Sequence, residues 1–354
     1  MKILITGGAG FVGANLATSF KAKMPSATVV AFDNLKRRGS ELNPSRLKKL
    51  GIEFVHGDIR NPADLDALAG NFDLLIECSA EPSVTAGLTG SPRYLLETNL
   101  VGTLHCLEFA RHRVAGTIFL STSRVYSIAP LKEIALVEAK TRFELAGEQT
   151  ITGLSALGIA ETFPTHRPRS LYGASKLSSE FIFQEYMDTY GMKGVINRCG
   201  VLFGPGQFGK VDQGVFTLWV ANHYYGRSLS YTGFGGSGKQ VRDLLHPGDL
   251  FSLILLQIEK MDFISGRTFN VGGGPANSSS LLELTSLCRE MVGRSVDLQS
   301  VPMTTSVDIP YFVTDSSEVK RTLEWAPQRS VRDMVVDVVG WIRENDAMLA
   351  PLYC

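Results

Sequence analysis

The chain opens with a short apolar run that leads directly into Thr6-Gly7-Gly8-Ala9-Gly10-Phe11-Val12-Gly13 (residues 6–13). The run Lys2–Thr6 predicts a buried strand, and the following segment Phe11–Lys21 predicts an amphipathic helix. Glycines at this spacing let the backbone turn tightly and approach a pyrophosphate, whose charge the helix N-terminus would bind. A glycine triplet alone carries little information, but its place between a strand and a helix predicts a dinucleotide-binding turn. The residues expected to bind the cofactor there are Gly7, Gly10, Phe11, Val12 and Gly13.

The first half of the chain repeats this pattern of a β-branched run, a turn and a helical stretch. Near-continuous apolar strands that alternate with helices predict a parallel sheet covered on both faces. Right-handed crossovers then give an α/β fold with a doubly wound Rossmann sheet. The expected strands are Lys2–Thr6, Thr28–Asp33, Glu53–Gly57, Asp73–Cys78, Thr117–Ser121 and Gly194–Arg198, and the expected helices are Phe11–Lys21, Pro62–Leu68, Pro92–Arg111 and Ser175–Tyr190.

The regular alternation of strand-like and helical segments ends at about residue 199, after which glycine-rich stretches interrupt the sequence. We therefore expect residues 1–198 plus 239–272 to form the dinucleotide-binding domain. Residues 199–238 plus 273–354 would form a smaller C-terminal α/β lobe for the substrate. Residues 127–170 are long for a connection, and such segments are usually functional or carry structure of their own. A substrate lid is one interpretation of them.

Composition excludes several classes of protein. The 354 residues hold 35 Lys plus Arg against 35 Asp plus Glu, so the formal net charge is zero. A binder of nucleic acid or of an anionic membrane usually has a basic excess, and we expect neither partner. The longest nearly apolar run, Phe251–Ile258, is too short for a membrane span. The first strand begins at Lys2, which leaves no room for a signal peptide. Five cysteines without metal-ligand spacing indicate reduced thiols, no metal site and a cytoplasmic protein.

Two acidic residues follow strands at the expected cofactor edge. Asp33 comes 20 residues after Gly13, where a carboxylate would accept hydrogen bonds from a ribose and repel a 2′-phosphate. This favours NAD over NADP, although the basic run Lys36–Arg38 could also receive that phosphate. Asp58 could bind the adenine amino group or, equally, cap the helix that follows it.

A second cluster of motifs carries polar groups suited to proton transfer. The run Ser121–Tyr126, which contains Thr122, follows the fifth expected strand, and Tyr172 and Lys176 lie four residues apart on one helical face. An ammonium beside a phenol lowers the phenol pKa from about 10, so Tyr172 could remove a proton from an alcohol. Thr122 would hold the same oxygen. A tyrosine and a lysine at this spacing are common on helix surfaces, and only the combination with the glycine turn and Asp33 predicts catalysis.

The motifs TGGAGFVG, FDNL, GDIR, STSRVY and YGASK, in this order, resemble the extended branch of the short-chain dehydrogenase/reductases, which contains the nucleotide-sugar epimerases and dehydratases. The resemblance runs from residue 1 to about 342. It implies bound NAD, a nucleotide-sugar substrate, Tyr172 as the base, and Lys176 and Thr122 as its catalytic partners. It also implies a homodimer paired through the helices Pro92–Arg111 and Ser175–Tyr190, whose apolar faces could equally pack on the sheet. The further cofactor contacts that it implies are Asn34, Asp58, Ile59, Ser79, Ala80, Asn99 and Ser121, with Tyr172 and Lys176.

Within this family, dehydratases carry an Asp-Glu pair directly after the catalytic threonine. Ser123 and Arg124 stand there, which disfavours elimination of water. The segments Val55–Asn61, Asp212–Gly214 and Gly238–His246 resemble those of the CDP-paratose 2-epimerases, in which the arginine matching Arg242 meets the diphosphate. The alternative is a surface arginine paired with Asp243. The substrate contacts expected on this basis are Glu81, Ser123, Arg124, Gln213, Gln240 and Arg242.

Three positions depart from the family pattern. Val201 replaces an asparagine, Pro310 stands where relatives often place a second phosphate-binding arginine, and Glu81 brings an acid to the sugar site, unless it caps a helix. The sequence therefore leaves the sugar, the nucleobase and the epimerised carbon open, with C2 preferred over C4. A net dehydrogenase or reductase and a non-catalytic NAD-sensing protein are the alternatives.

Overall fold

The computed structural model describes residues 1–209 and 213–353, whose contacts divide the chain into two compact units. The first comprises Met1–Val125, Ser170–Cys199 and Leu250–Phe269, and the second comprises Tyr126–Arg169, Gly200–Asp249 and Asn270–Cys354. The two largest differences from the expected boundaries are residues 126–169 and residues 239–249, which belong to the second unit. Hydrogen bonds within that unit, described below, explain both differences. The second unit is consequently about as long as the first.

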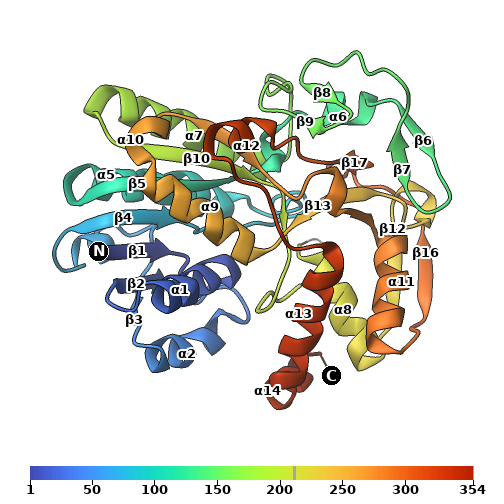
Figure 1. Ribbon diagram of the computed structural model, residues 1–354, viewed down its shortest axis with the longest axis horizontal. Helices are drawn as coiled ribbons and strands as arrows, with labels where there is room; N and C mark the ends of the chain where they lie inside the picture. Colours follow the sequence, from blue (N-terminus) through green and yellow to red (C-terminus); the bar gives the residue numbers. More distant parts are fainter. Residues whose placement is uncertain (210–212, 354) are drawn as a thin grey trace. The chain divides into compact units, whose positions relative to one another are not determined.

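A parallel seven-stranded sheet organises the first unit, as the sequence predicts. Its strand order is β14-β10-β5-β4-β1-β2-β3, and the labels from β10 to β3 follow one another in this order in Figure 1. The chain order reverses beside β1, which makes this a doubly wound Rossmann-type sheet. Its strands are β1 (Lys2–Thr6), β2 (Thr28–Asp33), β3 (Glu53–His56), β4 (Phe72–Glu77), β5 (Val114–Thr122), β10 (Gly194–Cys199) and β14 (Thr268–Val271).

Helices cover both faces of this sheet because its strands carry apolar side chains on both sides. Phe20 of α1 packs edge-to-face on Phe251 of α9, with ring centroids 4.9 Å apart. On the other face, Phe109 of α5 and Phe183 of α7 belong to two core clusters. The helices are α1 (Phe11–Lys23), α2 (Asn43–Lys49), α3 (Pro62–Asp66), α4 (Arg93–Leu96), α5 (Thr103–Arg113), α7 (Leu171–Tyr190), α9 (Pro247–Glu259) and α10 (Met261–Ile264), with short 3-10 turns at η1 (Ser40–Leu42) and η3 (Ser123–Val125).

The helix expected over Pro92–Arg111 is interrupted. A π-helical segment, η2 (Glu97–Gly102), joins α4 to α5. Such segments insert a residue into the helical ladder and are frequent at functional sites. The buried Asn99 lies within it.

The second unit contains several small sheets. Val241–Leu245 (β13) is central to the largest, where it pairs with β11, β15 and β17. This pairing explains why residues 239–249 belong to the second unit. The strands are β6 (Leu136–Glu138), β7 (Phe143–Leu145), β8 (Leu154–Ser155), β9 (Gly158–Ile159), β11 (Val201–Leu202), β12 (Leu229–Thr232), β13, β15 (Ser278–Ser280), β16 (Leu298–Val301) and β17 (Tyr311–Phe312).

One apolar core holds the helices of the second unit together. It is built around Trp219 of α8, Leu284 of α11 and Val338 of α13, all fully or almost fully buried. The helices are α6 (Ile128–Glu133), α8 (Val215–Tyr225), α11 (Leu281–Val292), α12 (Ser317–Leu323), α13 (Val331–Glu344) and α14 (Asp346–Tyr353), with 3-10 turns η4 (Phe234–Gly236) and η5 (Pro275–Asn277). In the described part of the chain, no helix is long and apolar enough to cross a membrane. The four described cysteines are free thiols, and Cys354 lies outside the described residues.

A buried ion pair connects three elements of the first unit. Glu180 of α7 contacts Arg198 of β10 at 2.8 Å and also accepts a hydrogen bond from the hydroxyl of Ser121 on β5. The side chains of Glu180 and Arg198 are only 1% and 10% exposed. Burial has removed water from both charges. Either residue without the other would leave an uncompensated charge in the core, which would destabilise the fold.

We expect Glu180→Ala to lower the free energy of unfolding by about 3–5 kcal/mol, because Arg198 would remain buried without its partner. Asp262→Ala is the matched control, since Asp262 pairs with Lys193 at the surface of the same unit and such pairs contribute about 0–1 kcal/mol. Urea unfolding of the two variants tests this. Equal losses in both would contradict the structural role of Glu180.

Candidate active site

The glycine turn between β1 and α1 has the geometry that close approach to a phosphate needs. Gly7 has a φ of 63°, and a Cβ added at Gly13 would lie 2.2 Å from the carbonyl oxygen of Gly7. The N-cap residue of α1 is Gly10, and neither a side-chain cap nor an acid covers its first turn. The N–H groups at the start of this 13-residue helix are thus open to an anion, so the turn fits a dinucleotide pyrophosphate.

Asp33 lies beside this turn. Its Oδ2 accepts a hydrogen bond from the N–H of Ala9 at 3.1 Å, and its Oδ1 accepts one from the N–H of Leu35 at 2.7 Å. Burial raises the pKa of Asp33, while these backbone donors oppose the shift. The carboxylate is therefore fixed at the edge where an adenosine ribose would bind.

Asp58, at the next strand end, forms a network with its neighbours. It binds Arg60 at 2.6 Å and accepts a hydrogen bond from the amide of Asn34 at 3.0 Å. Burial acts to raise the pKa of Asp58, but the hydrogen bonds from Arg60 lower it to about 2. The alternative that Asp58 caps the next helix is wrong, because the N-cap residue of α3 is Asn61. The side chain of Ile59 belongs to the apolar core instead.

Asn99 fixes the turn after β4. Its Oδ1 accepts from the N–H of Glu81 at 2.7 Å, and its amide donates to the carbonyl of Glu81 at 3.0 Å and to Ser175 of α7 at 3.2 Å. Asn99 is fully buried, so its side chain fixes the backbone of Glu81 from within the unit. The Glu81 carboxylate accepts from the N–H of Ser83 at 3.2 Å and so caps this turn rather than a helix.

The expected catalytic groups Thr122, Tyr172 and Lys176 all lie in the first unit. The hydroxyl of Thr122 acts to lower the pKa of the Tyr172 phenol and accepts a hydrogen bond from the N–H of Arg124 at 3.2 Å. Burial raises the pKa of Tyr172 to about 12, while Thr122 and the Arg124 guanidinium act to lower it. The sequence-based expectation of a pKa below 10 is therefore wrong for the protein without a cofactor.

Burial of the phenol is the main cause of the raised pKa of Tyr172, and the surroundings of Lys176 add to it. Its ammonium is 3.5 Å from the carboxylate of Glu77 and 4.0 Å from the ring centroid of Phe119. Glu77 balances the positive charge that was expected to stabilise the phenolate, and it acts to raise the pKa of Tyr172. Glu77 was missed from the sequence. The signal in the sequence was an acidic residue in the expected strand Asp73–Cys78, directly after the apolar residues 74–76.

Ser121 is engaged elsewhere. Its hydroxyl donates to Glu180, and the residue is 5% exposed. Ser123 and Arg124 form the turn η3 directly after Thr122, and both are half-buried. The first unit therefore brings together the expected catalytic groups and three of the expected substrate contacts, Glu81, Ser123 and Arg124.

The remaining expected substrate contacts belong to the second unit. Arg242 of β13 binds Asp308 at 3.0 Å and the carbonyl of Ile309 at 2.7 Å. The alternative pairing with Asp243 is wrong, since consecutive strand residues point to opposite faces and Asp243 is fully buried. The carbonyl of Pro310 accepts from the N–H of Val241 at 2.9 Å, which places this departure beside β13.

Two glutamines expected at the substrate site carry unsatisfied groups. Gln240 donates to the carbonyl of Thr232 at 3.1 Å. The side-chain oxygens of Gln240 and Gln213 are buried and have no hydrogen-bond partner among the described residues. Buried acceptors of this kind usually bind water or a ligand donor. Asp212, from the same motif as Gln213, lies outside the described residues.

The segment 127–170 is attached to the rest of the second unit. The N–H of Phe143 in β7 donates to the carbonyl of Lys239 at 2.9 Å, and the N–H of Ile159 in β9 donates to that of Val313 at 2.8 Å. Arg142, another residue missed from the sequence, binds Glu283 and Ser278. These contacts place the segment in the second unit, and an opening lid would have to break them.

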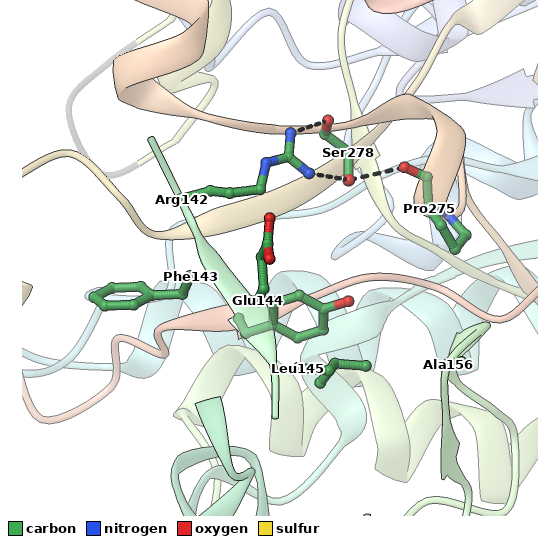
Figure 2. A pocket seen from close by; sticks show the side chains of 8 residues that line it. Arg142, Phe143, Glu144, Leu145, Ala156, Pro275 and Ser278 are labelled. Carbon is green, nitrogen blue, oxygen red and sulfur yellow. Dashed lines mark hydrogen bonds between the residues drawn. The ribbon is translucent and has the colours of Figure 1, made fainter. Parts of the chain in front are cut away.

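A pocket of about 240 Å³ lies against this segment. Figure 2 shows the Arg142 guanidinium hydrogen-bonded to Ser278, which in turn donates to the carbonyl of Pro275. The pocket is lined by Arg142, Phe143, Glu144, Leu145, Ala156, Pro275, Ser278 and Tyr311. The described residues contain no group of three His, Cys, Asp or Glu side chains arranged to hold a metal ion.

Comparisons with known proteins agree with this arrangement. The model of the NAD dependent epimerase/dehydratase family matches residues 3–272. CDP-paratose 2-epimerase of Salmonella typhi is 33% identical to the chain, over 96% of this chain and 99% of that protein. dTDP-glucose 4,6-dehydratase of Streptomyces niveus is 27% identical, over 99% of this chain and 96% of its own length.

Solved structures extend the comparison to the fold. A double mutant of DesIV, a dTDP-glucose 4,6-dehydratase from Streptomyces venezuelae solved with NAD bound, is similar with a TM-score of 0.80 and 26% identity. The similarity covers 99% of this chain and 100% of that one. The predicted Rossmann fold and the predicted NAD cofactor are confirmed. Since the family model covers most of its length, the chain belongs to the NAD dependent epimerase/dehydratase family, a family of enzymes.

Proposed function

We propose that this protein is an NAD-dependent nucleotide-sugar epimerase that inverts C2 of a CDP-sugar such as CDP-paratose. The observation that carries the proposal is that Thr122, at the end of β5, acts on the phenol of Tyr172, with Lys176 one helical turn further along α7. A near full-length relative named CDP-paratose 2-epimerase supports the substrate class. Ser123 and Arg124 follow Thr122 and offer no acid for the elimination that a dehydratase performs.

The residues proposed for the cofactor would each bind one part of the dinucleotide. The open N–H groups of Phe11 and Val12 and the close approach at Gly7, Gly10 and Gly13 would hold the pyrophosphate. Asp33 would accept hydrogen bonds from the adenosine ribose, while Asn34 and Asp58 would bind the adenine end. Ile59, Ser79, Ala80 and Ser121 would contribute through their backbone, and Asn99 through the turn that it fixes.

The chain's own part in the chemistry is proton transfer. Tyr172 would take the hydroxyl proton at the carbon that is oxidised, and Thr122 would hold the same oxygen through its hydroxyl. Bound NAD supplies the acceptor for the hydrogen on that carbon and returns it within the same turnover. Tyr172 would then give its proton back to the oxygen of the keto sugar after the sugar has presented its opposite face.

Six residues are proposed for the substrate. In the first unit these are Glu81, Ser123 and Arg124, which follow strand ends where ligands bind in such sheets. In the second unit they are Arg242 for the diphosphate and the buried amide oxygens of Gln213 and Gln240 for hydroxyl or amine donors. We also propose that the protein is cytoplasmic, consistent with its free thiols.

The proposed epimerase activity is tested by measuring product formation together with the redox state of the cofactor, which should be the same before and after turnover. Incubation with CDP-paratose should yield its C2 epimer, read by NMR, with no accumulation of NADH absorbance. Tyr172→Phe should lower kcat by about 10²–10⁴-fold while NAD affinity stays unchanged, because only the proton carrier is removed. Stoichiometric NADH would instead indicate a dehydrogenase, and inversion at C4 of another nucleotide sugar would indicate a different epimerase.

Cofactor preference gives a second test. We expect NAD to bind at least about tenfold more tightly than NADP, because the Asp33 carboxylate would repel a 2′-phosphate. Asp33→Ser should reduce or reverse this preference, and Asp66→Ser, an exposed acid of α3, should leave it unchanged. Fluorescence titration with both cofactors measures the ratio. Preference for NADP in the unchanged protein would contradict the role of Asp33.

A homodimer paired through α5 and α7 forms part of the proposal. These two helices lie side by side. Large apolar side chains are exposed on α7 and on the π-helical segment before α5, including Phe181 at 55% and Val101 at 40% exposed. Burying such side chains in a second copy of the chain would remove them from water.

Light scattering tests the dimer. Phe181→Asp should yield a monomer because it would bury a charge at the centre of the proposed interface. Phe263→Asp is the control, since Phe263 is also exposed, at 69%, but lies on α10. A dimer that survives Phe181→Asp, or a monomeric unchanged protein, would be evidence against this interface.

A further inference from the structure

The ion pair of Lys176 and Glu77 is the most buried pair of opposite charges near the proposed base. Both side chains are 2% exposed, and the ammonium lies 3.5 Å from Glu77 Oε2. Glu77 ends β4, where it is the register partner of Thr6 on β1 and of Phe119 on β5. Its Oε1 accepts from the N–H of Ser79 at 3.0 Å, so the carboxylate is held by the backbone of the next turn.

The ring of Phe119 completes the environment of the ammonium. Its centroid lies 4.0 Å from Lys176 Nζ, on the strand next to β4. A cation over an aromatic face is attracted to it, and the ring also excludes water. Lys176 is therefore held between one aromatic ring and one carboxylate.

The other titratable groups around this pair are neutral. Cys78 directly after β4, Cys106 on α5 and Cys199 on β10 all interact electrostatically with Glu77 or Lys176. Burial raises the pKa of each of these thiols, that of Cys199 to about 12. No thiolate therefore replaces Glu77 as the counter-charge of Lys176 at neutral pH.

We propose that Glu77 is a positioning residue for the epimerase reaction, which holds the Lys176 ammonium by a buried ion pair and cancels its charge beside Tyr172. This inference rests on the proposed function for its role in turnover, while the pair itself belongs to the protein without ligands. A lysine alone at this place would favour the phenolate at all times. When it is paired with Glu77, the ammonium of Lys176 is held in place but does not favour the phenolate of Tyr172.

The consequence is that Tyr172 stays protonated until another positive charge arrives. The groups that act on the pKa of its hydroxyl are Thr122 on β5, Arg124 on η3, Cys199 on β10 and Glu77 on β4. Lys176, the partner of Glu77, lies on the same helix as Tyr172. Of these groups, Arg124 carries a positive charge that favours the phenolate. Oxidised NAD would bring a further positive charge, so the base would become active with the cofactor that accepts the hydrogen.

The first experiment is the pH dependence of turnover in Glu77→Gln, which keeps the shape and removes the charge. Activity should fall on the acidic side as pH drops through the pKa of Tyr172 in the enzyme–substrate complex. Without Glu77 the free charge of Lys176 lowers that pKa, so the acidic limb should move to lower pH by about 1–3 units. Glu77→Asp, which withdraws the carboxylate by one carbon, should shift it in the same direction by less and serves if Glu77→Gln folds poorly.

The second experiment needs no substrate or cofactor. Tyrosinate absorbance is compared between each protein and its Tyr172→Phe counterpart up to about pH 11, below the pKa of about 12 expected for Tyr172. The unchanged protein and its Tyr172→Phe variant should show the same tyrosinate absorbance. The Glu77→Gln protein should show one more tyrosinate than its own Tyr172→Phe counterpart. Glu180→Gln is the matched control, because it removes a buried acid of α7 that pairs with Arg198 instead.

The outcomes separate the two proposals. The role of Glu77 would be overturned if both Glu77 variants kept the acidic limb of the pH–activity profile and the tyrosinate titration of the unchanged protein. An equal shift of that limb in Glu180→Gln would overturn it as well. Absence of nucleotide-sugar turnover in the unchanged protein would overturn the proposed function, and the tyrosinate titration would still decide whether Glu77 cancels the charge of Lys176.

Discussion

The buried face of α7 can be polar because the neighbouring strands supply a partner for each of its charged groups. Tyr172, Lys176 and Glu180 are spaced four residues apart and so lie on one face of the helix. Thr122 acts on the phenol of Tyr172, Glu77 pairs with Lys176, and Arg198 pairs with Glu180. An unpaired charge at Lys176 or at Glu180 would carry its full desolvation cost.

This constraint links stability to chemistry. The strands β4, β5 and β10 are adjacent in the sheet, and their carboxyl ends carry Glu77, Thr122 and Arg198. The same contacts that hold α7 on the sheet therefore set the distance from the phenol to its hydroxyl partner and the net charge around it. Asn99 extends the arrangement, since its amide joins the turn after β4 to Ser175 of α7.

The glycine turn, the order of the strands and the helical spacing of Tyr172 and Lys176 could be predicted because each is a local pattern. Glu77, Arg142 and the partner of Arg242 could not. Each depends on a contact between residues far apart in the chain, as in the pairing of Arg242 with Asp308. The pKa of Tyr172 was mispredicted for the same reason, since the sequence shows the lysine nearby but neither the burial of the phenol, which is the main cause, nor the carboxylate of Glu77.

The segment 126–169 shows the same limit at the level of whole units. Its sequence is a long connection between a strand and a helix, which suggested membership of the first unit. Its hairpins bond to Lys239 and Val313, which only the folded chain brings within reach.

The sequence alone determined the Rossmann-type sheet, the dinucleotide turn and the helix that carries the proposed base, because backbone conformation and apolar periodicity are properties of neighbouring residues. Only the tertiary structure decided which charges meet, which hydroxyl is already engaged, and hence how acidic the proposed base is. The physical reason is that a buried charge is governed by the groups within a few ångströms of it, and those groups come from every part of the chain.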